Sequence, residues 1–319
     1  MIKTTHILWQ SNEYDYAHAI DFVPNVVSYC HDDARIRPAM LILPGGGYGF
    51  VSPSEAEIVA KAYYERGFNA FVCTYTTNFF HQYPLQLQPL KDVSRATRFI
   101  RKKAAEFNIN PQQIVVAGFS AGGHLAGSLA VHYADMIDEQ SAYQAISNRP
   151  DAVILAYPVI TSGTYTHQGS MEALLGTQPA EQALHYMSLE HHVTAQTPPS
   201  FIWHTADDSV VPVQNSYLYA EACLKAGVSF AHHVFTSGIH GLSLATDEWA
   251  NQQFGELYTR QQWVNVVNAI GDQLDPQKVA LIQSGREYCG SVLSPNANVA
   301  AWFDLSINWL QQQLYLQDL

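Results

Sequence analysis

The residue best suited to covalent chemistry is a serine held between two glycines. The pentapeptide Gly-Phe-Ser-Ala-Gly at 118–122 follows an apolar run at 114–117 and precedes a small-residue stretch typical of a helix. A G-x-S-x-G sequence on a strand-to-helix turn exposes its serine hydroxyl as a nucleophile. We therefore predict that Ser120 is a nucleophile, the alternative being a glycine-rich turn with an ordinary serine.

A nucleophilic serine needs a general base, and the sequence favours His240. This histidine lies in Ser-Gly-Ile-His-Gly at 237–241, after an apolar run at 229–235. The chain has 14 histidines, so the residue type alone indicates little. His240 stands out because glycines flank it and because it completes the chain order serine, acid, histidine. We expect core or surface positions for His6, His18, His81, His167, His185, His191 and His232, and structural roles for His124 and His204.

Two adjacent aspartates compete to orient that histidine. They lie in His-Thr-Ala-Asp-Asp-Ser-Val-Val-Pro at 204–212, after an apolar run at 201–203. We favour Asp208, which is four residues after His204 and four before Pro212. Asp207 remains the alternative, and its other possible role is to cap the following turn.

A glycine run offers backbone donors for a developing oxyanion. Pro-Gly-Gly-Gly-Tyr at 44–48 directly follows the apolar run at 40–43. Glycines allow N–H groups to point into a site, where they stabilise negative charge in a transition state. The N–H of Ala121, next to the predicted nucleophile, is the expected second donor. We expect Tyr48 to line the substrate pocket. The alternative for the glycine run at 44–48 is a flexible turn without a binding role.

The order of apolar and helical segments predicts an α/β fold. Near-continuous apolar runs alternate with helical patterns, which indicates a mostly parallel, doubly wound sheet with helices on both faces. Ser54 and Glu57 have the spacing of a capping box at a helix start. The expected strands lie at 40–43, 69–75, 114–117, 152–157, 201–203 and 229–235, and the expected helices at 54–67, 92–107, 213–226 and 299–319.

Two segments depart from this alternation within a single predicted domain, 1–319. We expect 159–198 to form a short cap over the pocket, with an equal case for its apolar residues packing a connecting helix. The segment 249–295 is rich in Gln and Asn and predicts a helical insertion that roofs the pocket or forms a subunit contact. The apolar cap residues are Tyr165, Met171, Leu174, Leu175 and Tyr186.

The composition excludes several classes of protein. The chain has 319 residues, of which 47% are hydrophobic and 14% are charged, so it is neither disordered nor a coiled coil. A net charge of −12 without a basic stripe argues against nucleic acid and anionic membranes as partners. Cys30, Cys73, Cys223 and Cys289 match no zinc spacing. No apolar stretch reaches about 18 residues, so we expect a soluble cytoplasmic protein and leave open whether it forms homo-oligomers.

Four segments together resemble a known family of enzymes. PGGGY, GFSAGGHLAG, HTADDSVVP and GIHGLSLA are similar to motifs of the BD-FAE-like and hormone-sensitive-lipase-like esterases, a group that includes acetyl esterases and acetylxylan esterases. The resemblance covers roughly residues 38 to 247 and resumes near Asn298. Pro44, where H-G-G-G lipases have histidine, points to the sugar-esterase-like branch.

The resemblance implies an α/β-hydrolase that cleaves short acyl esters, often acetyl groups on sugars, without a cofactor or metal. Position by position, it implies a triad of Ser120, Asp208 and His240 and oxyanion donors at Gly46, Gly47 and Ala121. Two alternatives remain: a peptidase or acyltransferase with the same triad, and a non-catalytic ligand-binding member of the fold. A non-catalytic member would be expected to have lost a triad residue, and none is missing here.

Overall fold

Eight strands form one sheet in the described part of the chain. The computed structural model describes residues 1–316 except 11, 15, 17, 18, 82, 257, 258, 285–292 and 315. The strands are β1 (Ile2–Ile7), β2 (Asn25–Cys30), β3 (Arg37–Leu43), β4 (Asn69–Thr74), β5 (Ile109–Phe119), β6 (Ala152–Ala156), β7 (Ser200–Thr205) and β8 (Phe230–Phe235).

The order of strands is β1-β2-β4-β3-β5-β6-β7-β8. The pairs from β4 through β8 are parallel, whereas β1 and β2 join the β4 edge in antiparallel fashion. All six strands expected from apolar runs are present, and the predicted α/β class is confirmed. The sequence does not mark β1, which is largely exposed and carries no continuous apolar run, or β2, in which Ser28 interrupts the apolar residues.

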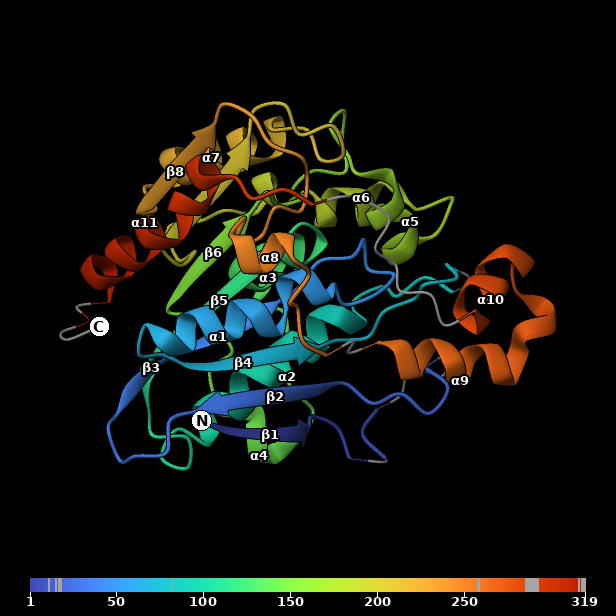
Figure 1. The fold of residues 1–319 in the computed structure, drawn as a ribbon, viewed down its shortest axis with the longest axis horizontal. Coiled ribbons are helices and arrows are strands. Elements are labelled where there is room, and N and C mark those ends of the chain that lie inside the picture. The colour runs from blue at the N-terminus through green and yellow to red at the C-terminus, as the bar shows by residue number, and fades with distance from the viewer. Residues whose placement is uncertain are drawn as a thin grey trace.

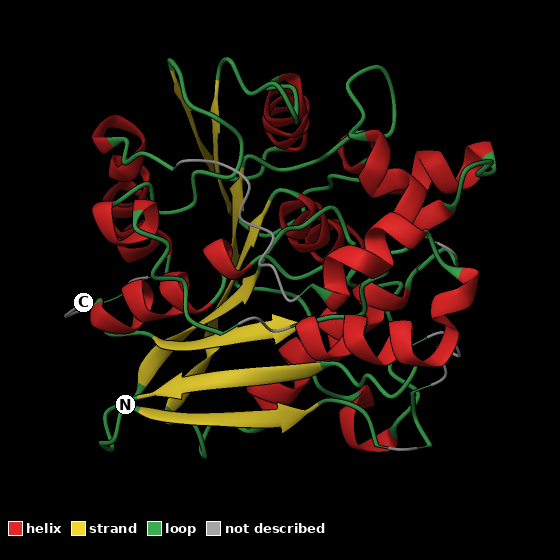
Figure 2. Ribbon diagram, turned by 45° about the vertical axis from the view of Figure 1, so that its right-hand side comes forward, coloured by secondary structure: helices red, strands yellow, loops and turns green. Residues whose placement is uncertain are grey.

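Helices cover both faces of this sheet (Figures 1 and 2). Side chains of α1 and α11 join the core on one face, and those of α2, α3 and α7 join the core on the other. The longer helices are α1 (Glu57–Glu65), α2 (Gln88–Lys102), α3 (Ala121–His132), α5 (Gln168–Leu175), α6 (Glu181–Met187), α7 (Gln214–Ala226), α9 (Arg260–Ile270), α10 (Pro276–Gln283) and α11 (Ala297–Gln313). Shorter turns are η1 (Pro53–Glu55), α4 (Ser141–Gln144), η2 (Leu189–His191), α8 (Asp247–Ala250) and η3 (Gly271–Gln273). No helix in these described segments is long and apolar enough to cross a membrane.

The start of α1 differs from the predicted capping box. The helix begins at Glu57, and no side chain caps its first turn. Glu57 instead forms ion pairs with Lys3 at 3.0 Å and with Lys61 at 2.8 Å. Its neighbour Glu55 turns inward and is 3% exposed. Ion pairs with Lys3 and Lys61 therefore replace the local capping contact of Glu57.

The cap and the insertion lie at the same side of the molecule. The cap segment contains α5, α6 and η2, and the insertion contains α9, η3 and α10, which project beyond the sheet in Figure 1. Asp275 caps α10 by accepting from the N–H of Gln277 at 2.8 Å. Gly285, the expected end of this helix, lies outside the described residues. The apolar cap residues Met171, Leu174 and Leu175 pack in the core, which agrees with the alternative that they pack a connecting helix.

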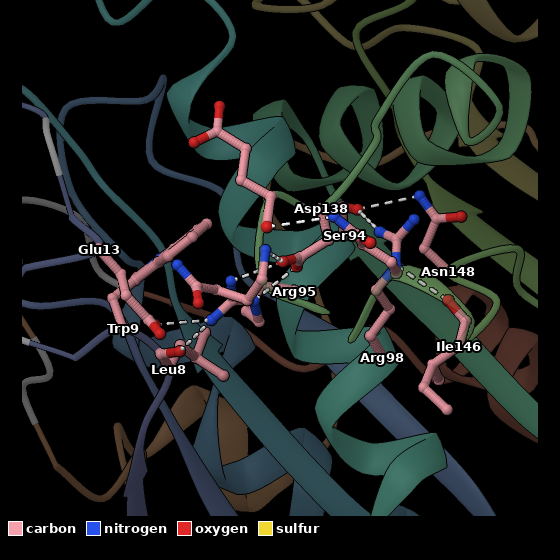
Figure 3. Close-up of polar contacts among 12 residues, drawn as sticks. Leu8, Trp9, Glu13, Ser94, Arg95, Arg98, Asp138, Ile146 and Asn148 are labelled. Carbon is pink, nitrogen blue, oxygen red and sulfur yellow. Dashed lines mark hydrogen bonds and ion pairs between the residues drawn. The ribbon is translucent and has the colours of Figure 1, made fainter. Parts of the chain in front are cut away.

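A buried arginine ties the N-terminal segment to α2 (Figure 3). Arg95 is 1% exposed, and its guanidinium donates to both carboxylate oxygens of Asp138, at 2.6 and 2.7 Å. It also donates to Glu13 at 3.0 Å, while its Cζ lies 4.2 Å from the ring centroid of Trp9. A buried arginine is tolerated because its charge is paired and its donors are used. This network therefore joins three segments that are distant in sequence.

Candidate active site

Ser120 occupies a tight turn between β5 and α3. Its backbone has φ 54°, a left-handed conformation that is strained for a residue other than glycine. The turn needs glycine nearby, because a Cβ at Gly122 would lie 2.0 Å from the carbonyl oxygen of Leu43. The sequence thus places the hydroxyl at the carboxyl end of a central strand, where parallel sheets present their sites.

Three side chains from separate loops form a continuous hydrogen-bonded chain. The Oγ of Ser120 lies 2.7 Å from Nε2 of His240, and Nδ1 of the same ring lies 2.7 Å from Oδ2 of Asp208. A carboxylate only accepts, so the imidazole donates from Nδ1 and accepts the serine proton at Nε2. The loops that follow β5, β7 and β8 supply the three residues. The structure brings together the three residues that the sequence analysis selected.

The environment of Asp208 favours its charged form. Burial raises the pKa of this carboxyl, but hydrogen bonds from His204 and His240 and the backbone N–H of Val211 outweigh burial and hold the pKa well below its usual range. Its Oδ1 accepts from the N–H groups of Val210 and Val211, both at 2.9 Å. Such fixed donors orient an ionised carboxylate toward the imidazole.

Asp207, the alternative acid, points elsewhere. It is exposed, and its Oδ1 accepts from the N–H of Gly238 at 2.8 Å. Asp207 therefore braces the loop that leads to His240 instead of contacting the ring. The geometry selects Asp208 as the partner of the imidazole.

The glycine run lies beside the serine hydroxyl. Gly46 has φ 115° and Gly47 has φ 61°, and both line the cavity that contains Ser120 and His240. Within the described residues, the N–H groups of Gly46, Gly47 and Ala121 donate to no protein acceptor. These N–H groups are free to receive a negatively charged oxygen.

Glu55 and Tyr157 form a buried pair behind the glycine run. Oε2 of Glu55 accepts from the N–H of Gly45 at 2.7 Å, and Oε1 accepts from the hydroxyl of Tyr157 at 2.7 Å. The same hydroxyl accepts from the N–H of Ser243 at 3.1 Å. Burial raises the pKa of Glu55, although these donors oppose the effect. The pair therefore links the glycine run to the loop that carries His240.

A cavity of about 870 Å³ opens over Ser120. Its floor contains Ser120 and His240, and its walls include the aromatic side chains of Phe50, Trp249 and Phe254. The predicted insertion supplies Trp249, Gln252, Phe254, Leu281 and Leu293 to this lining. These lining residues agree with the first role expected for the insertion, that of roofing the pocket.

Tyr48 lies in the core and not in the lining of the pocket, where it was expected. Its side chain is 1% exposed, and its hydroxyl lies 2.7 Å from Nδ1 of His124. Nε2 of His124 lies 2.9 Å from the carbonyl oxygen of Met187, to which it must donate, so Nδ1 accepts the tyrosine proton. Tyr48 is a core residue that supports the glycine run from behind, and the prediction that its side chain lines the pocket is wrong.

His167 is a cavity residue that the sequence analysis assigned to the core or surface. Its Nδ1 accepts from the N–H of Ser170 and caps α5, while its ring lines the catalytic cavity. No motif marks His167, and Glu55 was hidden inside an apparent capping box. Only the folded chain shows that these two residues face the site.

The fold and the site define the protein as an α/β-hydrolase. Similar proteins support this class. The chain is 50% identical over 255 residues to endo-1,4-beta-xylanase B of Butyrivibrio fibrisolvens, covering 80% of this chain and 40% of that protein. It is 31% identical over 214 residues to an acetylxylan esterase of Xylanibacter ruminicola, covering 65% of this chain and 42% of that protein. The chain thus spans about two fifths of the length of these curated relatives.

A solved structure agrees in fold. The acetyl ester-xyloside bifunctional hydrolase from Caldicellulosiruptor lactoaceticus superposes with a TM-score of 0.72 at 37% identity, covering 84% of this chain and 96% of that one. Residues 29–223 match the sequence profile of the BD-FAE family. The chain belongs to the BD-FAE family.

Proposed function

We propose that this chain is a serine carboxylesterase that removes short acyl groups, above all acetyl, from sugar esters. The observation that carries the proposal is the pair of 2.7 Å contacts joining Ser120, His240 and Asp208. A hydroxyl, an imidazole and a carboxylate in this order form the machinery of acyl transfer through a covalent intermediate. The names of the relatives, which include an acetylxylan esterase, support acetylated sugars as the substrate class.

The proposed reaction begins with attack of Ser120 Oγ on the ester carbonyl while His240 Nε2 takes the proton. Asp208 holds the ring in the required tautomer and stabilises the imidazolium. The N–H groups of Gly46, Gly47 and Ala121 stabilise the oxyanion. His240 then protonates the departing alcohol, and a water that it deprotonates releases the carboxylic acid and frees Ser120.

Labelling and a substrate series test this function. A fluorophosphonate probe should label the wild-type protein at Ser120, and Ser120→Ala should lose both labelling and ester hydrolysis. Among p-nitrophenyl esters, kcat/KM should be highest for acetate and fall with acyl length. Acetylated xylo-oligosaccharides should be deacetylated. Absence of labelling in folded wild-type protein, or faster cleavage of aminoacyl amides than of acetate esters, would refute the proposal.

A further inference from the structure

A second cavity of about 440 Å³ adjoins the catalytic one beside α10. Five residues line both cavities: Gly46, Gly47, Phe50, His167 and Leu281. An acetyl group is far smaller than these spaces, which are of the size that holds a whole small-molecule ligand. Of the two parts of an acetyl ester, only the alcohol part is large enough to fill the additional space.

The second cavity is lined by polar side chains at the start of α10, whereas Leu281 farther along the helix is apolar. Asp275 is the N-cap of this helix, Gln277 and Lys278 lie in its first turn, and His81 and His167 come from the facing loops. Lys278 donates from Nζ to the carbonyl oxygen of Phe79 at 3.0 Å, which fixes the helix against that loop. A wall with both donors and acceptors suits a ligand rich in hydroxyl groups, because each hydroxyl can donate and accept.

His167 lies where the two cavities meet, and its protonation is defined by its contacts. Nδ1 accepts from the backbone N–H of Ser170 at 3.3 Å and lies 2.8 Å from the Ser170 hydroxyl. A backbone N–H can only donate, so the neutral ring carries its proton on Nε2. Burial, reinforced by the nearby His240, lowers the pKa of His167, which favours this neutral ring.

The Nε2–H edge of His167 has no protein acceptor among the described residues. Its Cε1 lies 3.9 Å from the point where a Cβ on Gly47 would be, so this edge of the ring borders the glycine run. When water fills the cavity, this N–H donates to a water molecule, so its exposure does not lower the stability of the fold. When substrate displaces the water, the same N–H can donate to a substrate oxygen.

We propose that the cavity beside α10 is a sugar-binding subsite and that His167 donates from Nε2 to a hydroxyl or ring oxygen of the sugar that carries the acyl group. This inference rests on the proposed esterase function and deepens it. His167 thereby selects hydroxyl-bearing alcohols over purely apolar ones. Gln277, which is exposed on the first turn of α10, supplies a second contact to the same sugar unit.

Paired substrates separate this role from a structural one. Phenyl acetate has an apolar alcohol part, whereas acetylated xylobiose presents several hydroxyls, and kcat and KM are measured for both. His167→Asn keeps an acceptor for the N–H of Ser170 but is too short to reach the sugar. Gln277→Ala removes the contact on α10, and Gln283→Ala on the same helix is the control, because Gln283 lines neither cavity.

The expected result is a change in selectivity. In His167→Asn and in Gln277→Ala, kcat/KM for acetylated xylobiose should fall about 3- to 10-fold more than kcat/KM for phenyl acetate, mainly through KM. Gln283→Ala should leave the ratio unchanged, and all variants should melt near the wild type. Equal losses on both substrates would place His167 at the reacting ester and overturn the subsite.

Other outcomes separate the two proposals. If the wild type hydrolyses acetylated xylobiose and the variants keep its selectivity, the subsite proposal is wrong and the esterase function stands. Wild type that cleaves neither ester would refute the function itself. Wild type that cleaves phenyl acetate alone would remove the sugar from both proposals while leaving the serine chemistry intact.

Discussion

Oε1 of Glu55 accepts a hydrogen bond from the hydroxyl of Tyr157 at 2.7 Å, directly behind the glycine run. The carboxylate also holds the N–H of Gly45, and the tyrosine holds the N–H of Ser243. The ring of Tyr157 meets that of His240 edge to face, with centroids 5.0 Å apart. One buried pair therefore links the glycine run, which carries the proposed oxyanion donors, to the loop that carries His240, the proposed base.

Removing the hydroxyl of Tyr157 should weaken the link between the glycine run and the loop that carries His240. In Tyr157→Phe, the buried Glu55 loses a donor and the N–H of Ser243 loses its acceptor. We expect kcat to fall about tenfold, and the free energy of unfolding to fall by about 1–3 kcal/mol because buried polar groups are left unpaired. Kinetics on p-nitrophenyl acetate and urea unfolding measure the two effects.

Tyr63→Phe is the matched control for this substitution. Tyr63 is also buried, and its hydroxyl lies 3.2 Å from Oγ of Ser306 on α11, away from the cavity lining. Its loss should lower stability by about 0.5–1.5 kcal/mol and leave kcat unchanged. An equal fall in kcat for both variants would mean that Tyr157 acts only through stability.

The adjacent aspartates should differ sharply in their effect on activity. Asp208→Asn replaces the carboxylate that accepts from Nδ1 of His240, which leaves the imidazole in the wrong tautomer. We expect kcat to fall roughly 10⁴-fold, as in other triads that lose this charge. Asp207→Asn keeps an oxygen for the N–H of Gly238 and should change kcat less than about threefold. Similar losses from both substitutions would contradict the assignment of Asp208.

Acid should weaken the fold through His124. Burial lowers the pKa of His124 from 6.5 to about 4. Between these values the unfolded chain binds one more proton than the folded chain, so the free energy of unfolding falls as the pH drops from about 6.5 to about 4. The full effect of this one group is on the order of 3 kcal/mol.

His124→Gln isolates that contribution. The variant will be less stable at neutral pH, because it disturbs the contacts with Tyr48 and Met187. Its stability should nevertheless fall less steeply than that of the wild type between pH 6.5 and 4. Urea unfolding at several pH values measures both slopes, and parallel curves would show that His124 does not titrate on unfolding.

Two glycines should respond very differently to alanine. A Cβ at Gly122 would lie 2.0 Å from the carbonyl oxygen of Leu43 and 2.5 Å from that of Pro44, and this backbone cannot yield without displacing the turn that carries Ser120. We expect Gly122→Ala to fold poorly and to lack activity. Gly227 has φ 70° after α7 with nothing within 4 Å, so Gly227→Ala should cost only about 1 kcal/mol in strain. Thermal unfolding compares the two, and a well-folded, active Gly122→Ala would show that the turn can relax.

Local sequence determined the alternation of strands and helices. Runs such as 40–43 and 114–117 are apolar throughout because parallel strands are covered on both faces, so their chemistry alone identifies them. It also determined the serine turn, since glycine is needed wherever backbone passes as closely as it does at Gly122. Order along the chain and glycine neighbours were enough to select Ser120 and His240 as candidates.

Tertiary structure alone decided which neighbours complete the site. Asp207 and Asp208 have the same side chain, and only the direction of each in the folded loop shows which one meets the imidazole. Glu55 lies within an apparent capping box and His167 is expected in the core or at the surface, yet both line the cavity. Tyr48 adjoins the glycine run, yet the fold turns it into the core. Side-chain direction depends on what packs from distant parts of the chain, and local sequence does not carry that information.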